Sequence, residues 1–121
     1  MTMLEASLRY VVLHHTGFGD PHYDLMIESA LRASLMTWRL TDWPPAAGDT
    51  LTRIGEHRRA YLDYEGPVSN NRGHVRRVAS GNCECSINES QITIQFREPT
   101  RMLVLLRQIQ NGLWNVVEVD D

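Results

Sequence analysis

The stretch that decides the fold reads His14-His15-Thr-Gly-Phe-Gly-Asp-Pro-His22-Tyr23-Asp24-Leu-Met26-Ile-Glu28. Its loop, residues 16–21, contains two glycines and a proline, which interrupt regular structure. Residues 22–28 follow as a strand, in which alternate side chains share a face, so Tyr23, Leu25 and Ile27 form the apolar set that faces the core. The opposite face therefore carries His22, Asp24, Met26 and Glu28, and it begins with an imidazole and a carboxylate.

These side chains predict a metal site. His22 and Asp24 share a strand face, and His15 or His14 lies just upstream across the loop. Two imidazoles and one carboxylate leave positions open for water and a substrate oxygen, and they suit Mn²⁺, Zn²⁺ or Co²⁺ better than Ca²⁺ or Mg²⁺. The pattern alone is equally compatible with polar surface residues beside a loop.

Strand patterns continue along most of the chain. Residues 9–13 form a β-rich segment that runs into the histidines, and residues 34–40 form a strand after a turn, with a helix over 30–40 as the alternative. Asn111-Gly112 is the strongest hairpin signal in the sequence. The pattern predicts an all-β fold, a small closed or nearly closed β-barrel of about seven to eight strands with one or two short helical turns. The other expected strands cover residues 50–54, 74–78, 82–87, 91–96, 102–108 and 113–119.

Length and charge restrict the class of protein. A chain of 121 residues and 13.9 kDa is expected to form one domain, residues 1–121, with a loose start over residues 1–8. The net charge of −3, from 12 basic and 15 acidic residues, argues against a protein that coats nucleic acid without specificity. We expect a monomer.

The cysteines and the apolar segments indicate a cytoplasmic location. Cys83 and Cys85 are poorly placed for a routine disulfide with each other, so we interpret them as packed core thiols in a reducing compartment. No signal-peptide pattern is present, and no apolar run approaches the roughly 18 residues that span a bilayer. We therefore expect no membrane association.

A second group of candidate residues lies between residues 56 and 66. His57 and Tyr61 would face the same way if both belonged to one helical turn. Both side chains can donate hydrogen bonds, and histidine can act as a general acid near neutral pH. Taken alone, a solvated turn with a core tyrosine is the better interpretation. Among the other aromatic residues, we assign Tyr23 and Trp114 to the core and leave Trp43 open.

The motifs follow one another in an order that resembles a known family, the 3′-phosphoesterase domain of bacterial DNA ligase D. The resemblance extends from about Arg9 to Val119, and the ordered set is more specific than any single piece. The motifs are Arg9-Tyr-Val-Val, the His-containing loop, His22-Tyr23-Asp24-x-x-x-Glu28, Trp38, His57-x-x-x-Tyr61-x-x-x-Glu65-Gly66, Gly73-x-Val75, Gly81, Leu103-Val-Leu-Leu-Arg107 and Trp114.

The resemblance implies a small β-barrel with a Mn²⁺-dependent pocket. Such a domain removes a terminal ribonucleoside and then the 3′-phosphate from a DNA or RNA–DNA primer 3′ end, and it leaves a 3′-hydroxyl. A DNA ligase or end-joining protein would act with this chain in trans. The resemblance assigns metal binding to His15, His22 and Asp24, contact with the phosphate during catalysis to His57 and Tyr61, and a supporting turn to Glu65-Gly66.

Two departures from the family pattern affect these expectations. The family has a phosphate-binding arginine two residues after the aspartate, where this chain has Met26, and losing such a contact costs about 2–4 kcal/mol of transition-state stabilisation. Arg39 or Arg72 could supply a substitute. The family's first histidine lies six residues before the second, whereas position 16 here is threonine, so a loop one residue longer favours His15 over His14.

Because of Met26, two alternatives to a fully active enzyme stay open. The first is a non-catalytic module that binds metal and nucleic-acid ends or docks on a repair partner. The second is a phosphoesterase that acts on a small phosphate ester, which would need less basic surface.

Overall fold

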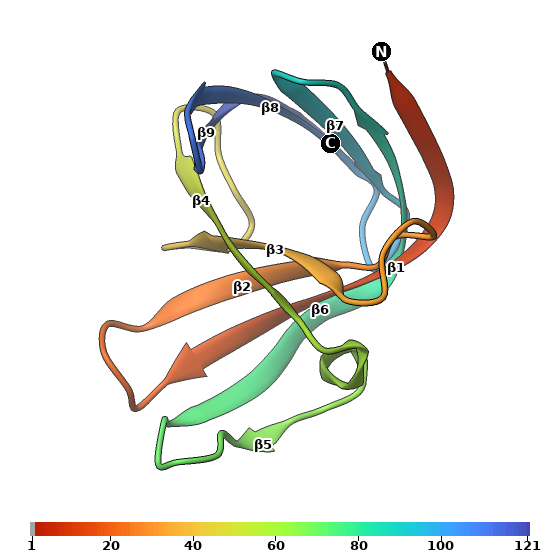
Figure 1. The fold of residues 1–121 in the computed structure, drawn as a ribbon. Helices are drawn as coiled ribbons and strands as arrows, with labels where there is room; N and C mark the ends of the chain where they lie inside the picture. Colours follow the sequence, from red (N-terminus) through yellow and green to blue (C-terminus); the bar gives the residue numbers. More distant parts are fainter. Residues whose placement is uncertain (1) are drawn as a thin grey trace.

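The computed structural model describes residues 2–121, and these residues form nine antiparallel strands and one short 3₁₀ turn (Figure 1). The predicted all-β fold is confirmed. The strands are β1 (Met3–Thr16), β2 (His22–Ile27), β3 (Leu35–Leu40), β4 (Thr50–His57), β5 (Gly66–Pro67), β6 (His74–Ile87), β7 (Gln91–Phe96), β8 (Met102–Gln110) and β9 (Leu113–Asp120), and the turn is η1 (Arg59–Leu62).

Eight strands close into an uneven ring. Their order is β1-β2-β3-β4-β9-β8-β7-β6, and pairing of β6 with β1 completes the ring. Strand β5 lies outside the ring and pairs only with the start of β6. In Figure 1, η1 and β5 lie below the ring, next to the extended halves of β1 and β6. Among residues 2–121 there is no helix with the length and apolar character that crossing a bilayer requires.

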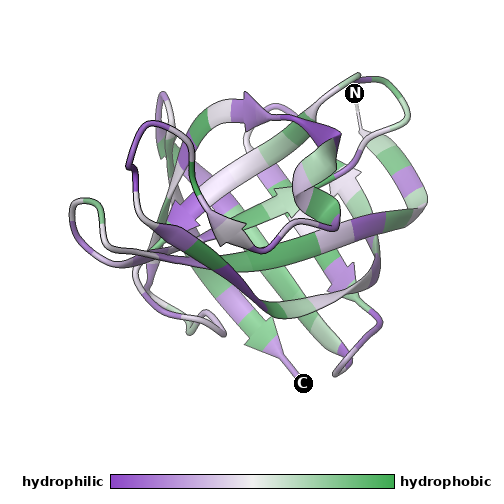
Figure 2. Ribbon diagram, turned by 90° about the horizontal axis from the view of Figure 1, so that it is seen from below, coloured by the Kyte–Doolittle hydropathy of each residue, from purple (hydrophilic) through white to green (hydrophobic). Residues whose placement is uncertain are grey.

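The interior of the ring is the larger core, and we call the side of each strand that points into it the inner face. Trp38, Leu25, Val12 and Phe96 are almost completely buried there. Hydrophobic residues are concentrated along the strands, while the connecting loops are mostly hydrophilic (Figure 2). At roughly 25 cal/mol per Å² of buried apolar surface, this core is the main source of stability.

A smaller core covers the other side of β1, β2 and β3, which we call the outer face. Val11 and Leu13 alternate along β1 with the inner-face residues, and they pack with Met26, Leu35 and, from η1, Leu62. Strand β1 is therefore buried on both faces, which explains why residues 10–13 form a continuous apolar run and not an alternating one.

Two expectations about the strands are wrong. The expected loose start over residues 1–8 is instead the beginning of β1, which pairs from Met3 opposite Ile87 to Leu8 opposite Cys83; Met1 lies outside the described residues. The two strands expected over 74–78 and 82–87 are one strand, β6. Gly81 does not interrupt it, because the missing side chain lets the strand pass Glu98, whose Cβ would lie 2.9 Å from a Cβ at this position.

Other local predictions are confirmed. Gly112 has a φ of +81° in the turn between β8 and β9, as the Asn-Gly signal predicts. Cys83 and Cys85 are buried, unpaired thiols of the larger core. The turn and strand that we preferred over a helix for residues 30–40 end in β3.

Candidate metal centre and its cavity

The β1–β2 pairing brings the predicted metal ligands together. His15 lies directly opposite His22, and Asp24 follows two residues later on the same outer face. One ligand atom from each of the three side chains lies within 4.8 Å of the others. His15 Nδ1 is 3.2 Å from His22 Nε2, which is in turn 3.5 Å from Asp24 Oδ2. The group could hold a metal ion.

Backbone carbonyls fix the tautomers of the two histidines. His15 Nε2 lies 2.7 Å from the Arg72 carbonyl oxygen, and His22 Nδ1 lies 2.9 Å from that of Asp20. A carbonyl only accepts, so each of these ring nitrogens donates, and in neutral rings the lone pairs lie on His15 Nδ1 and His22 Nε2. Carbonyl partners of this kind orient metal-binding histidines in many proteins.

The two lone pairs face one another and need a cation or a proton between them. Two nitrogens bound side by side to one ion, each at about 2.1 Å, are separated by roughly 3.0–3.4 Å. The 3.2 Å between His15 Nδ1 and His22 Nε2 falls in this interval. The donor set therefore fits a metal ion by chemistry and by spacing.

His14 takes no part in this group. Its ring stacks on Tyr23, with 4.4 Å between ring centroids and 13° between planes. His14 and Tyr23 are opposite each other in the ladder, one position along from His15 and His22, so they lie on the other side of the sheet. The structure thus places His15, and not His14, beside His22 and Asp24.

Asp24 is only 3% exposed and is held by its cross-strand partner Arg39. Arg39 Nε donates to Asp24 Oδ1 at 3.0 Å, and an NH2 group donates to Oδ2 at 3.3 Å. An ionised carboxylate has about four lone-pair positions, so Asp24 can accept both bonds and still ligate a metal. The Arg39 side chain is 41% exposed and lines the cavity next to the ligands, which leaves other N–H donors for a bound anion.

A cavity of about 710 Å³ opens at the three ligands. Strand register explains its lining, because Asp24, Arg39 and Thr52 are successive cross-strand neighbours on β2, β3 and β4. The predicted residues His57 and Tyr61 line the same cavity, as does Arg72. Both predicted groups of site residues therefore contribute to one cavity.

His57 and Tyr61 do not share a helical turn, so the condition under which they would face the same way on one turn is not met. His57 is the last residue of β4, and Tyr61 belongs to the 3₁₀ turn η1. Their rings nevertheless meet edge to face, with 5.6 Å between centroids. Tertiary packing of η1 against the sheet brings them together.

Burial lowers the pKa of His57, and the nearby Asp24 carboxylate offsets part of that effect. The Thr37 hydroxyl donates its single proton to the Leu35 carbonyl, so it accepts from His57 Nδ1, 3.1 Å away. In this arrangement His57 is neutral at pH 7, and Nε2 carries the lone pair.

Met26 lines the cavity at 2% exposure and packs on Val11 and Leu35. Position 26 therefore contributes no cationic side chain to the cavity. The arginines that line the cavity are Arg39 and Arg72, and the Arg72 guanidinium donates to the carbonyl and hydroxyl oxygens of Ser69.

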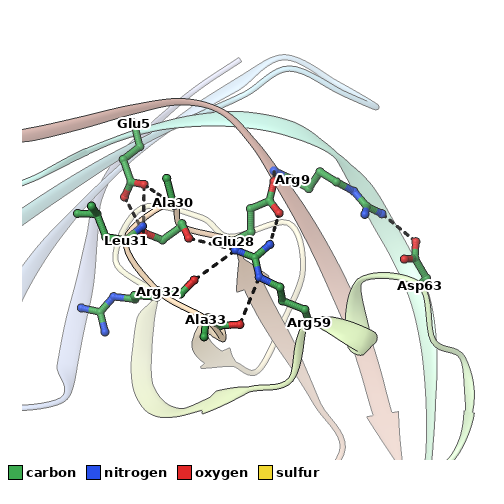
Figure 3. A network of polar contacts seen from close by, with 10 residues as sticks. Glu5, Arg9, Glu28, Ala30, Leu31, Arg32, Ala33, Arg59 and Asp63 are labelled. Carbon is green, nitrogen blue, oxygen red and sulfur yellow. Dashed lines mark hydrogen bonds and ion pairs between the residues drawn. The ribbon is translucent and has the colours of Figure 1, made fainter.

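The sequence analysis missed Arg59, which holds η1 in place (Figure 3). From the first position of η1 it reaches into the loop between β2 and β3, where it pairs with Glu28 Oε2 at 2.6 Å. It also donates to three backbone carbonyls, those of Ser29, Arg32 and Ala33, each at 3.2 Å. No local pattern distinguishes this arginine from its neighbour Arg58, because its partners are about 26 to 31 residues away in sequence.

Phe18 is a second cavity residue that the sequence did not predict, although it lies in the glycine-flanked loop between the two histidine ligands. It lines the cavity and is 53% exposed. Trp43, left open above, packs its ring edge to face on Phe96 as part of the larger core. Trp114 is buried and Tyr23 packs against the same core, as predicted.

Neither a protein-family model nor a curated protein sequence matches this chain.

Proposed function

We propose that the protein is a metal-dependent phosphoesterase that processes the 3′ end of DNA or of an RNA–DNA primer, with Mn²⁺ as the preferred ion. It would remove a terminal ribonucleoside and the 3′-phosphate and leave a 3′-hydroxyl for a ligase or end-joining protein. The observation that carries the proposal is the convergence of His15, His22 and Asp24 with His57 and Tyr61 on one cavity. The motif order supports the choice of a nucleic-acid 3′ end.

In this proposal, His15, His22 and Asp24 hold the ion. When bound, the ion polarises a phosphate oxygen and lowers the pKa of a coordinated water. The protein's own contribution is to preset the two ring tautomers through the Arg72 and Asp20 carbonyls. Since the ligands are already oriented, little rearrangement is needed for binding.

Arg39 and Tyr61 would donate hydrogen bonds to the phosphate oxygens. Both line the cavity, and Arg39 keeps donors free while it bonds Asp24. Charge-assisted bonds of this kind are roughly twice as strong as neutral ones, so Arg39 partly replaces the arginine that the family has at position 26.

His57 would act as the general acid that donates a proton to the leaving oxygen. It is neutral in the free cavity, and the negative charge of an entering phosphate raises its pKa again. A ring that gains a proton as the phosphate binds can then donate that proton to the leaving oxygen. Thr37 orients the ring through Nδ1, so Nε2 is the nitrogen that exchanges the proton.

The direct test incubates the protein with Mn²⁺ and a primer that ends in a 3′-phosphate, and it measures 3′-hydroxyl ends by polymerase extension. We expect extension with the wild-type protein and loss of at least about 100-fold with His22→Ala. His14→Ala is the matched control and keeps its activity, because His14 stacks on Tyr23 away from the cavity. Equal activity of all three proteins, or equal activity in excess EDTA, would contradict the proposal.

Met26 favours a second candidate, a non-catalytic module that binds metal and nucleic-acid ends. An apolar side chain lines the cavity where a phosphate-binding arginine is expected, and Arg39, which would have to substitute for it, uses two of its N–H groups on Asp24. This candidate predicts salt-sensitive binding of 3′-phosphate ends without turnover. It also predicts that Met26→Arg creates activity that the wild-type protein lacks.

A further inference from the structure

We infer that a second cleft, next to the phosphate cavity, binds the base of the 3′-terminal nucleotide by stacking; this inference rests on the proposed function. The cleft has a volume of about 330 Å³ and is lined by residues of η1 and of the segment around β5, among them Tyr61, Tyr64, Arg58 and Val68.

The two cavities are neighbours that share walls. Tyr61 and Val68 line both of them. In a nucleotide that ends in a 3′-phosphate, only the sugar separates the base from the phosphate. A nucleotide whose phosphate lies at the metal centre therefore has its base within reach of the second cleft, on the far side of the Tyr61 ring.

Tyr64 offers a fixed aromatic surface in this cleft. Its hydroxyl donates to the Pro67 carbonyl, and its ring meets Tyr61 edge to face, with 5.9 Å between centroids and 90° between planes. The residue is still 37% exposed. A ring that is already held in place loses little entropy when a base stacks on it, and every base has a face that can stack.

Arg58 adds an uncommitted cation beside the same aromatic pair. Its guanidinium carbon lies 6.0 Å from the Tyr61 ring centroid, and across residues 2–121 the guanidinium makes no hydrogen bond or ion pair. Its neighbour Arg59, by contrast, uses its guanidinium to hold the β2–β3 loop. A planar cation of this kind stacks on bases and pairs with backbone phosphates.

The inferred ligand is thus a purine or pyrimidine base joined through its sugar to a 3′-phosphate. The competing surface is Phe18, which is exposed in the loop that lines the phosphate cavity and does not line the second cleft. The two locations are separable by mutation, because Phe18 and Tyr64 come from different loops.

The test compares two fluorescent oligonucleotides with a 3′-phosphate, one with a terminal deoxyadenosine and one with an abasic terminal sugar. Fluorescence anisotropy measures both dissociation constants in the presence of Mn²⁺, with the terminal phosphate replaced by a non-hydrolysable phosphonate so that no turnover occurs. We expect the wild-type protein to bind the deoxyadenosine end about 10-fold more tightly. Tyr64→Ala should abolish this preference. Arg58→Ala and Tyr64→Phe should reduce it, because Tyr64→Phe keeps the ring but loses its bond to Pro67, and Phe18→Ala should retain it.

Three results would overturn the inference: equal wild-type affinity for the two ends, no binding of either, or loss of the preference in Phe18→Ala but not in Tyr64→Ala. Circular dichroism checks that each variant folds, and Arg58→Ala tests the cleft independently of the tyrosine. The readout is a ratio of affinities, so it does not depend on turnover. A protein that prefers the base yet forms no 3′-hydroxyl disproves only the proposed activity, and one that hydrolyses both ends with equal affinity disproves only the base-binding cleft.

Discussion

The two faces of strands β1, β2 and β3 have opposite roles, although they are made from alternate residues of the same segments. On the inner face, Val12, Leu25 and Trp38 are fully or almost fully buried among other apolar side chains. On the outer face, Val11 and Met26 are buried too, but polar ligands and an open cavity follow within a few residues.

The difference shows how a small barrel can carry a site without opening its core. The inner face stabilises the ring by burying apolar side chains. The outer face is apolar where Val11, Leu13 and Met26 pack with Leu62 of η1, and it becomes polar toward the strand ends that carry His15 and His22. Substitutions on the two faces should therefore separate stability from metal binding.

The largest effect is expected on the inner face. Trp38→Ala removes a fully buried indole and should lower the free energy of unfolding by about 3–5 kcal/mol. Urea denaturation measures this loss. His22→Ala, on the polar part of the outer face, removes a side chain that lines the open cavity and should cost only about 1 kcal/mol in the metal-free protein. Losses of equal size would show that the two faces do not differ as described.

The next effect concerns the metal. Saturating Mn²⁺ at about 100 times its dissociation constant should stabilise the wild-type protein by about 2.7 kcal/mol. His22→Ala should abolish this stabilisation, because it removes a ligand and one of the two facing lone pairs. Thermal unfolding with and without Mn²⁺ measures the difference. His14→Ala should be stabilised by Mn²⁺ as much as the wild type. If His14→Ala loses this stabilisation, His14 and not His15 is the metal ligand.

A smaller effect is expected at Gly73, which packs against the backbone of the loop after His15. Its φ is +82°, and a Cβ there would lie 2.1 Å from the Thr16 carbonyl oxygen. Gly73→Ala should therefore cost about 1–3 kcal/mol and also weaken Mn²⁺ binding, because it displaces the segment that carries the Arg72 carbonyl bonded to His15. Gly48→Ala is the control: its φ is +97°, but no atom lies within 4 Å of an added Cβ. A stability loss at Gly73 without weaker metal binding would refute the link to His15.

The smallest effect is a pH dependence that His57 contributes in the metal-free protein. Burial lowers the pKa of His57 below its ordinary 6.5, so the unfolded chain binds the proton more readily than the folded one. The free energy of unfolding should therefore fall as pH drops below about 6.5, and His57→Gln should remove that part of the slope. Urea denaturation at a series of pH values between about 7.5 and 5 measures this pH dependence. If the free energy of unfolding changes with pH equally in both proteins, the burial effect is contradicted.

The sequence predicted those parts of the site that depend on strand period and short loops. Alternation along residues 22–28 placed His22, Asp24 and Met26 on one face, and they line one cavity. It could not predict that η1 packs on this face, because Arg59 reaches partners about 30 residues away. Nor could it predict the N-terminal half of β1, where pairing with the distant end of β6 gives the exposed Met3 and Leu4 a strand conformation.

Local chemistry by itself determined the all-β class, the hairpin at Asn111-Gly112 and the shared face of His22 and Asp24, since each follows from backbone geometry over a few residues. Only the tertiary structure decided which upstream histidine joins them. Cross-strand register puts His15 opposite His22 and turns His14 onto Tyr23, and a shift of one residue would exchange the two. The site thus depends on register, which long-range pairing fixes across the whole ring.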